Sequence, residues 1–278
     1  MISGKTALYG VVGHPIGHSR SPAMHNAAYA RLGIDAVYVA MPVEPGRLPA
    51  ALDGAHALGF RGLNVTVPHK PEAFGLCREL DPVAREVGAV NTLRRLGEGW
   101  EGFNTDAPAT LQLLDGAGFA RGGRLLLLGA GGVARAAAWA ALAMGAELLV
   151  AARRPEAAAE VCRDALAASR GGGSAQPIRW DRATTESSRC NAIVNATTIG
   201  LAPRGAADLA PLGIAARTVV VDYVYGDTAF VRAAREAGAR VVTGEELLVR
   251  QGALAFGLWL GQAAPEPAMA AAVEGGNR

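Results

Sequence analysis

One heptapeptide combines a strand-like alternation with a lysine placed for acid–base chemistry. Residues 64–70 read Asn-Val-Thr-Val-Pro-His-Lys, so Asn64 and Thr66 are expected on one strand face and the two valines on the other, against an apolar core. Pro68 ends the strand just before Lys70. A lysine held partly out of water in the loop that follows would be suited to proton transfer. Taken alone, the pattern is more typical of an ordinary loop lysine after a buried strand.

A second stretch has the spacing of a dinucleotide-binding turn. Four leucines at 125–128 read as a strand and precede G-x-G-x-x-A, which is followed by a helical pattern. The turn residues are Gly129, Ala130, Gly131, Gly132, Val133 and Ala134. Glycine permits the tight turn and lets the backbone approach a pyrophosphate, whose charge meets the open N–H groups of the helix start. Glycine-rich loops are common, so the position between a strand and a helix is what makes this run predict a nucleotide site.

The end of the next expected strand indicates which nucleotide would bind. An acidic residue there would accept hydrogen bonds from a free ribose 2′-hydroxyl. This chain has Arg153 and Arg154 instead, and no carboxylate before Glu156. Guanidinium groups form charge-assisted bonds with a phosphate, so the pair favours NADP(H) over NAD(H). The alternative is two solvated arginines at a helix start.

Three further runs are rich in hydroxyls and amides. They cover residues 13–22, 88–92 and 102–106. A polyhydroxylated ligand needs such a mixture of neutral donors and acceptors more than it needs charge. Taken alone, Ser21 is more typical of a helix N-cap before Pro22, and residues 104–106 could cap the helix that follows.

Strand and helix patterns alternate along the chain, which predicts an α/β framework for these residues. Strands are expected at 8–12, 36–41, 63–67, 124–128, 147–151, 192–195, 218–222 and 240–242, helices at 22–32, 48–58, 107–114, 133–144 and 246–261, and a hairpin at 93–100. A break near Asp106 separates two α/β series. We expect a Gly/Ser loop at 169–175 and a frayed tail after Pro265.

Composition excludes several classes of protein. The 278 residues are 50% hydrophobic and 19% charged, which is typical of a globular chain of one or two domains. The net charge of +2 lacks the strong positive excess that is typical of nucleic-acid-binding proteins. Gly145 and Glu147 interrupt the apolar run 136–152, so no membrane span is expected, and no signal peptide is apparent. The three dispersed cysteines predict neither a disulfide framework nor a metal site, and a cytoplasmic location is the simplest expectation.

The order of the motifs resembles the shikimate dehydrogenase family. Its G-x-P-I-x-H-S-x-S-P-x-x-H-N, N-V-T-x-P-x-K, G-A-x-N-T and G-x-N-T-D signatures correspond to residues 13–26, 64–70, 88–92 and 102–106. The nucleotide turn, an N-A-T-[ST]-x-G run at 195–200 and an L-V-x-Q-G run containing Gln251 complete the series. The resemblance covers nearly the whole chain.

This resemblance implies a fold and a set of site residues. The fold would be α/β with two domains: an N-terminal α/β substrate domain (1–106 plus 246–278) and a Rossmann-like doubly wound NADP-binding domain (107–245), with a cleft between them. Lys70 and Asp106 would form the catalytic pair. Substrate contacts would come from Ser19, Ser21, Thr66, Asn91, Asp106, Tyr225 and Gln251. Cofactor contacts would come from residues 129–134, Arg153, Arg154, Thr197 and Gly244, with no metal.

The implied activity is the reversible, NADPH-dependent reduction of 3-dehydroshikimate to shikimate, in chorismate and aromatic amino-acid biosynthesis. The expected partners are the small-molecule substrate and NADP, without nucleic acid or membrane, in a monomer or homodimer. One alternative is a quinate/shikimate or aminoshikimate dehydrogenase that uses NAD or NADP. The other, a non-catalytic NADP-binding regulator, is disfavoured because Lys70 and Asp106 are both present.

Three departures from the family pattern concern the cofactor half. Ala152-Arg153-Arg154 stands where Asn-Arg-Thr is frequent. The D-x-x-Y run at 222–225 is followed by Gly226-Asp227 in place of a nearby proline. The G-x-G-M run is Gly244-Glu245-Glu246-Leu247, which places extra acid near the expected nicotinamide end.

Overall fold

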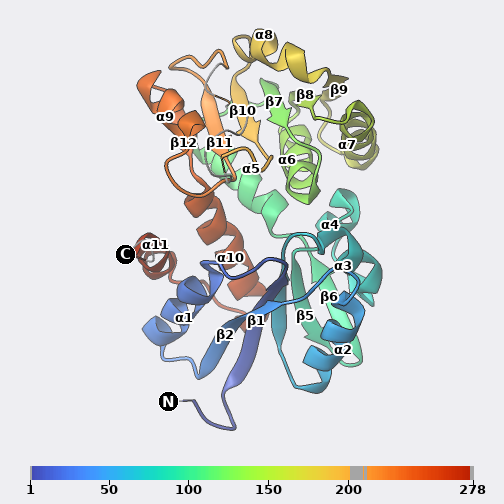
Figure 1. Ribbon diagram of the computed structural model, residues 1–278, viewed down its shortest axis with the longest axis vertical. Helices are drawn as coiled ribbons and strands as arrows, with labels where there is room; N and C mark the ends of the chain where they lie inside the picture. The colour runs from blue at the N-terminus through green and yellow to red at the C-terminus, as the bar shows by residue number, and fades with distance from the viewer. Residues whose placement is uncertain (1, 201–208, 210–211, 276–278) are drawn as a thin grey trace. The chain divides into compact units, whose positions relative to one another are not determined.

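The computed structural model describes residues 2–200, 209 and 212–275, which divide into two compact units (Figure 1). The first unit comprises Met1–Thr105 and Leu248–Arg278, and the second comprises Asp106–Leu247. Helix α10 (Gly244–Leu260) begins in the second unit and continues into the first.

The described residues of the first unit form a six-stranded mixed sheet in the order β2-β1-β3-β5-β6-β4. Strand β1 is parallel to β2 and β3, whereas β5 is antiparallel to β3 and β6, and β4 is parallel to β6. The elements are β1 (Ala7–Gly13), α1 (Ser21–Leu32), β2 (Ala36–Pro42), α2 (Leu48–Ala57), β3 (Gly62–Val65), α3 (Lys70–Leu76), β4 (Glu79–Leu80), α4 (Pro82–Val87), β5 (Thr92–Leu96), β6 (Gly99–Phe103) and α11 (Glu266–Gly275).

Alternation along β1 sends its side chains into two different cores, as period two requires. Val12 packs in one apolar cluster with Leu52 of α2. Tyr9 faces the opposite side of the sheet, where its ring centroid lies 5.7 Å from that of Tyr29 and 5.2 Å from that of Trp259. The sheet is therefore buried on both faces.

His25 is fully buried in this aromatic cluster. Its ring stacks on that of Tyr38 with centroids 4.3 Å apart. Neither ring nitrogen has a hydrogen-bond partner among the described residues. Because burial disfavours the charged form, the pKa of His25 is lowered from 6.5 to about 3. His25 therefore stays neutral in the folded state at pH values where the unfolded chain would bind a proton.

Replacing His25 by phenylalanine is expected to make the protein less sensitive to acid. Between pH 6.5 and about 3 the unfolded state binds a proton at this site that the folded state does not. The free energy of unfolding therefore falls as pH falls, by up to about 1.4 kcal/mol per pH unit. Urea unfolding at about pH 7 and about pH 4.5 should show the wild type losing on the order of 2 kcal/mol more than H25F. An equal loss of unfolding free energy in both proteins would contradict the lowered pKa of His25 in the folded state.

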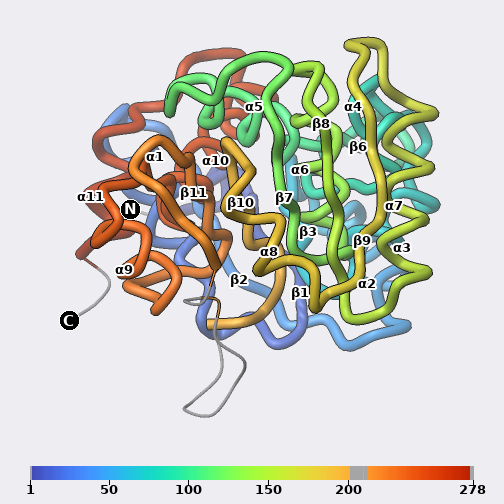
Figure 2. Tube along the Cα trace, turned by 90° about the horizontal axis from the view of Figure 1, so that it is seen from above, coloured from blue at the N-terminus to red at the C-terminus, as the bar shows by residue number. Residues whose placement is uncertain are grey.

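The second unit has the strand order of a Rossmann fold. Its described residues form a six-stranded parallel sheet, β12-β11-β10-β7-β8-β9, and Figure 2 shows β11, β10, β7 and β8 side by side. The elements are α5 (Asp106–Gly116), β7 (Arg124–Leu128), α6 (Gly132–Ala143), β8 (Glu147–Ala151), α7 (Pro155–Ala168), β9 (Ser174–Ile178), a 3₁₀ turn (Trp180–Arg182), α8 (Ala183–Ser187), β10 (Ala192–Asn195), β11 (Val219–Asp222), α9 (Ala229–Glu236) and β12 (Arg240–Val242).

The leucines of β7 show why this sheet is doubly wound. Leu125 and Leu127 pack in the cluster that includes α6, whereas Leu126 and Leu128 pack in the cluster that includes Phe230 of α9. A strand buried on both faces reads as a continuous apolar run, as parallel sheets require. The predicted α/β class with a Rossmann-like doubly wound unit is confirmed.

Two local predictions are wrong. Residues 266–275, the described part of the tail after Pro265, are not frayed, because α11 buries Met269 and Val273, which lie four residues apart on one helix face. The Gly/Ser loop is shorter than expected, because β9 begins at Ser174 and pairs with β8. Short polar edge strands of this kind carry little apolar signal.

Within the described ranges, no helix has both the length and the apolar character needed to cross a membrane. The same residues contain no group of three or more His, Cys, Asp or Glu side chains arranged to hold a metal ion. All three cysteines are free thiols.

Candidate active site

The sheet topology of the first unit brings its polar runs to one edge. Because β1 and β3 are parallel, the run after β1 and the run after β3 lie side by side, with Val12 opposite Val65. Strand β5 is antiparallel to β3, so Thr92 at its start lies opposite Asn64. Strand β6 returns to end at Phe103, again opposite Thr92. Motifs distant in the chain are therefore neighbours in space.

Lys70 is fixed at this edge by backbone hydrogen bonds. Thr66 N–H donates to the Val12 carbonyl at 2.9 Å, and His69 N–H donates to the Thr66 carbonyl at 2.9 Å. The Val90 N–H donates to the Lys70 carbonyl at 3.1 Å, which joins this run to the one that contains Asn91. Lys70 is only 9% exposed.

Two details of the predicted Lys70 setting are wrong. Lys70 is the first residue of α3 and does not lie in a loop. Val65 is buried as expected, but Val67 is 62% exposed, because β3 ends at Val65 and the chain turns at Thr66. Side-chain alternation predicts facing only while a strand continues.

A buried hydrogen-bond network orders the end of this edge. Asn91 Oδ1 accepts from Thr105 N–H at 2.8 Å, and Asn91 Nδ2 donates to Thr105 Oγ1 at 3.0 Å. Asn64 Nδ2 donates to Thr92 Oγ1 at 3.0 Å, and Asn64 Oδ1 accepts from the Tyr38 hydroxyl at 2.7 Å. Thr105, the residue before Asp106, is therefore held directly against Asn91.

Ser19 and Ser21 lie at the start of α1. The interpretation of Ser21 as an N-cap is wrong, because Arg20 is the N-cap residue and no side chain caps the helix. Helix α10 packs closely on α1, since a Cβ at Gly252 would lie 2.3 Å from the Met24 methyl carbon. Gln251 immediately precedes Gly252 in α10, and its Nε2 donates to the Leu248 carbonyl at 2.8 Å.

The glycine turn of the second unit has the backbone that its sequence predicts. Gly129 has φ of +113°, and a Cβ there would lie 2.6 Å from the Ala196 carbonyl oxygen and 3.3 Å from the Thr197 methyl carbon. Gly131 caps α6 without a side-chain hydrogen bond, and nothing lies within 4 Å of its potential Cβ. Open N–H groups at a helix start suit a pyrophosphate.

The two arginines after β8 are available to a ligand. Arg153 and Arg154 are exposed at the carboxyl end of the strand that follows the glycine turn. Neither guanidinium forms an ion pair or hydrogen bond with any residue in the described part of the chain. The open turn and this donor pair fit a dinucleotide that carries a 2′-phosphate.

Asp106 is the first residue of α5 and is 8% exposed. Its carbonyl accepts from Thr110 Oγ1 at 2.7 Å, and Thr110 Oγ1 in turn hydrogen-bonds the Tyr223 hydroxyl. Burial raises the pKa of Tyr223, and the Asp106 charge raises it further. Within the second unit, Asp106 is therefore tied to the residues that follow β11.

The sequence interpretation missed a buried network that holds the loops after β10 and β11. Asp222 is fully buried and accepts from Asn195 Nδ2 at 2.9 Å and from Thr228 Oγ1 at 2.6 Å. Burial raises the pKa of Asp222. Asn195 Oδ1 also accepts from Thr197 Oγ1 at 2.7 Å. The signal available in the sequence was that the otherwise apolar strands β10 and β11 each end in a polar residue, Asn195 and Asp222.

His69 was also missed, although it precedes Lys70. It is 1% exposed, and its Nε2 lies 2.7 Å from the Val43 carbonyl oxygen. The Glu72 carboxylate lies 3.7 Å from its Nδ1. His69 therefore fixes the turn that leads into Lys70.

Comparison with known proteins decides the family. The shikimate dehydrogenase (NADP(+)) of Anaeromyxobacter sp. (strain K) is 62% identical over 274 residues, which cover 99% of this chain and 98% of that protein. The chain belongs to the shikimate dehydrogenase family. Two family models match: "Shikimate dehydrogenase substrate binding domain" at residues 11–93 and "Shikimate 5'-dehydrogenase C-terminal domain" at residues 244–274. The resemblance inferred from the motifs is confirmed.

Solved structures of related dehydrogenases share the fold. The shikimate 5-dehydrogenase of Thermus thermophilus, in complex with NADP(H) and shikimate, is 35% identical with a TM-score of 0.85 and covers 97% of this chain and 99% of its own. The quinate dehydrogenase of Corynebacterium glutamicum, in complex with NAD, is 29% identical with a TM-score of 0.87 and covers 97% and 99%.

Proposed function

We propose that this protein is an NADP-dependent shikimate dehydrogenase, which reversibly reduces 3-dehydroshikimate to shikimate. The observation that carries the proposal is the 62% identity, over nearly the whole chain, to a relative named for this reaction and cofactor. The first unit would bind the substrate and the second would bind NADP. A cytoplasmic monomer or homodimer remains our prediction from the sequence.

The proposed proton donor is Lys70. When bound, NADPH would supply a hydride to the ketone carbon, and the substrate oxygen would then need a proton. The Lys70 ammonium would donate that proton, and Asp106 would orient the ammonium and the substrate hydroxyl. Backbone hydrogen bonds support the pairing of Lys70 with Asp106. The Lys70 carbonyl accepts from Val90 N–H, and Thr105 N–H donates to Asn91, the residue after Val90. Asp106 follows Thr105 directly in the chain.

Substrate recognition would use neutral hydrogen-bonding groups around Lys70. Ser19 and Ser21 would bind the carboxylate, and Thr66, Asn91 and Gln251 would bind ring hydroxyls. Asn91 already uses its oxygen and one N–H to hold Thr105. An amide nitrogen carries two hydrogens, so Asn91 would present its second N–H to the substrate.

Cofactor binding would use the open glycine turn and the arginine pair. Residues 129–134 would bind the pyrophosphate and Arg153 and Arg154 the 2′-phosphate. Thr197 and Gly244 would complete the cofactor contacts.

An assay of four substrate pairs tests the proposal. We expect NADP⁺ with shikimate to be reduced faster than NADP⁺ with quinate or NAD⁺ with either substrate. Comparable rates with quinate and NAD⁺ would instead favour a quinate/shikimate dehydrogenase, the second candidate, which the structural similarity to an NAD-bound quinate dehydrogenase supports. No turnover with any pair would contradict both functions.

A further inference from the structure

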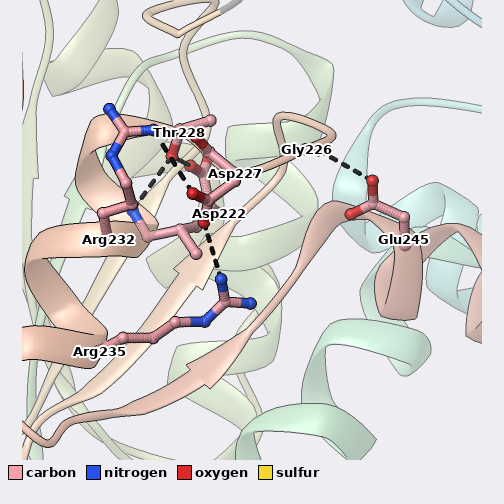
Figure 3. A network of polar contacts seen from close by, with 8 residues as sticks. Asp222, Gly226, Asp227, Thr228, Arg232, Arg235 and Glu245 are labelled. Carbon is pink, nitrogen blue, oxygen red and sulfur yellow. Dashed lines mark hydrogen bonds and ion pairs between the residues drawn. The ribbon is translucent and has the colours of Figure 1, made fainter. Parts of the chain in front are cut away.

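Two of the departures from the family pattern meet in space. Glu245 Oε1 accepts a hydrogen bond from the backbone N–H of Gly226 at 2.8 Å (Figure 3). Gly226 has φ of +89°, a conformation that favours glycine, and nothing lies within 4 Å of its potential Cβ. The unusual glycine therefore presents its N–H to the unusual acid.

The same contact brings Tyr225 against the start of α10. A Cβ at Gly244 would lie 2.7 Å from the Val224 carbonyl oxygen and 2.9 Å from Tyr225 Cδ1. Only glycine lets the two segments approach this closely. The Glu245 hydrogen bond then secures the residue after Tyr225 to the residue after Gly244.

The remainder of this turn is anchored from the other side. Asp227 Oδ1 lies 2.7 Å from Arg235 Nη1, and its other oxygen lies 3.5 Å from Arg232 Nη1, both on α9 (Figure 3). Thr228 caps α9 and donates to buried Asp222. The segment 222–228, which we call the Tyr225 turn, is therefore tied to α9 on one side and to α10 through Glu245 on the other.

Glu245 is not the residue whose side chain caps the start of α10. That role falls to Glu246, whose carboxylate accepts from Thr243 N–H at 2.7 Å while Thr243 Oγ1 accepts from Glu246 N–H at 3.3 Å. This reciprocal pair is a capping box. Two adjacent glutamates thus have separate tasks, one for the helix start and one for the Tyr225 turn.

We propose that Glu245 is a positioning residue that sets the Tyr225 turn for substrate binding. The inference rests on the proposed function and on the substrate contact of Tyr225 that the family resemblance implies. The turn also reaches Asp106, since Tyr223 hydrogen-bonds Thr110, which hydrogen-bonds the Asp106 carbonyl. A charge-assisted bond to a backbone N–H is strong enough to hold one conformation of a glycine-containing turn.

Glu245→Leu is the test variant, and Glu245→Gln is its conservative partner, because glutamine keeps an oxygen acceptor at the same reach. Glu246→Leu is the matched control. We expect E245L to raise KM for shikimate about tenfold with a smaller change in kcat. E245Q should keep a KM close to that of the wild type. Only E246L should substantially lower Tm. Unchanged KM in E245L, or the same kinetic loss in E246L, would overturn the proposal.

Two further measurements separate positioning from a general structural effect. Hydrogen exchange of a peptide that covers residues 223–228 should quicken in E245L but not in E245Q or E246L, and this result does not depend on which substrate the enzyme uses. In a Tyr225→Phe background, E245L should raise KM for shikimate little further, because both changes act on the contact between Tyr225 and the substrate. Unchanged exchange, or fully additive kinetic losses, would refute the role of Glu245.

Discussion

Replacement of Lys70 by alanine is expected to lower kcat by about 100-fold or more with little change in KM, since general acid–base catalysis contributes about 10²- to 10⁴-fold. Lys70 is buried at the sheet edge where the polar runs meet, so bulk water cannot easily donate the proton in its place. Steady-state kinetics with NADPH and 3-dehydroshikimate, and with NADP⁺ and shikimate, measure the loss in both directions.

The small number of lysines in the chain provides control variants for this experiment. Of its 27 lysines and arginines, only Lys5 and Lys70 are lysines. Arginine supplies the positive charge nearly everywhere else, but a guanidinium cannot release a proton at neutral pH. We therefore expect Lys70→Arg to be as impaired in kcat as K70A, while Lys5→Ala serves as the matched control with normal kcat. A K70A enzyme with nearly normal kcat would exclude the catalytic role.

Replacement of Arg153 and Arg154 together by alanine is expected to weaken NADP⁺ binding by about 100-fold or more, because each charge-assisted hydrogen bond contributes about 1.5–3 kcal/mol. Both side chains are exposed, so the fold should be unaffected. NAD⁺ lacks the 2′-phosphate, and its affinity should change little. Isothermal titration calorimetry with each cofactor measures the difference.

Arg163, on the helix that follows these arginines, offers a control of the same charge. Its side chain is 70% exposed and lies 3.5 Å from Asp164. Arg163→Ala should leave the affinity for both cofactors nearly unchanged. Equal losses for NADP⁺ and NAD⁺ in the double variant would mean that the arginines do not contact the 2′-phosphate.

Most of the fold could be predicted from the sequence because its determinants are local. The continuous apolar run of β7 predicts a strand covered on both faces, and Gly129 adopts a positive φ that few other residues tolerate. The tail that forms α11 could not be predicted in this way. Its alanine-rich sequence becomes a stable helix because Met269 and Val273 are buried where α11 packs against α1, which lies far away in the chain.

By itself the sequence determined the family, the α/β class and the identity of the residues around Lys70, since order and spacing along one chain carry that information. Only the tertiary structure decided how they meet. The pairing of β5 between β3 and β6 holds Thr105 against Asn91, and the approach of α10 to Gly226 gives Glu245 its partner. Strand pairing and long-range hydrogen bonds depend on three-dimensional distance, which spacing in the sequence does not encode.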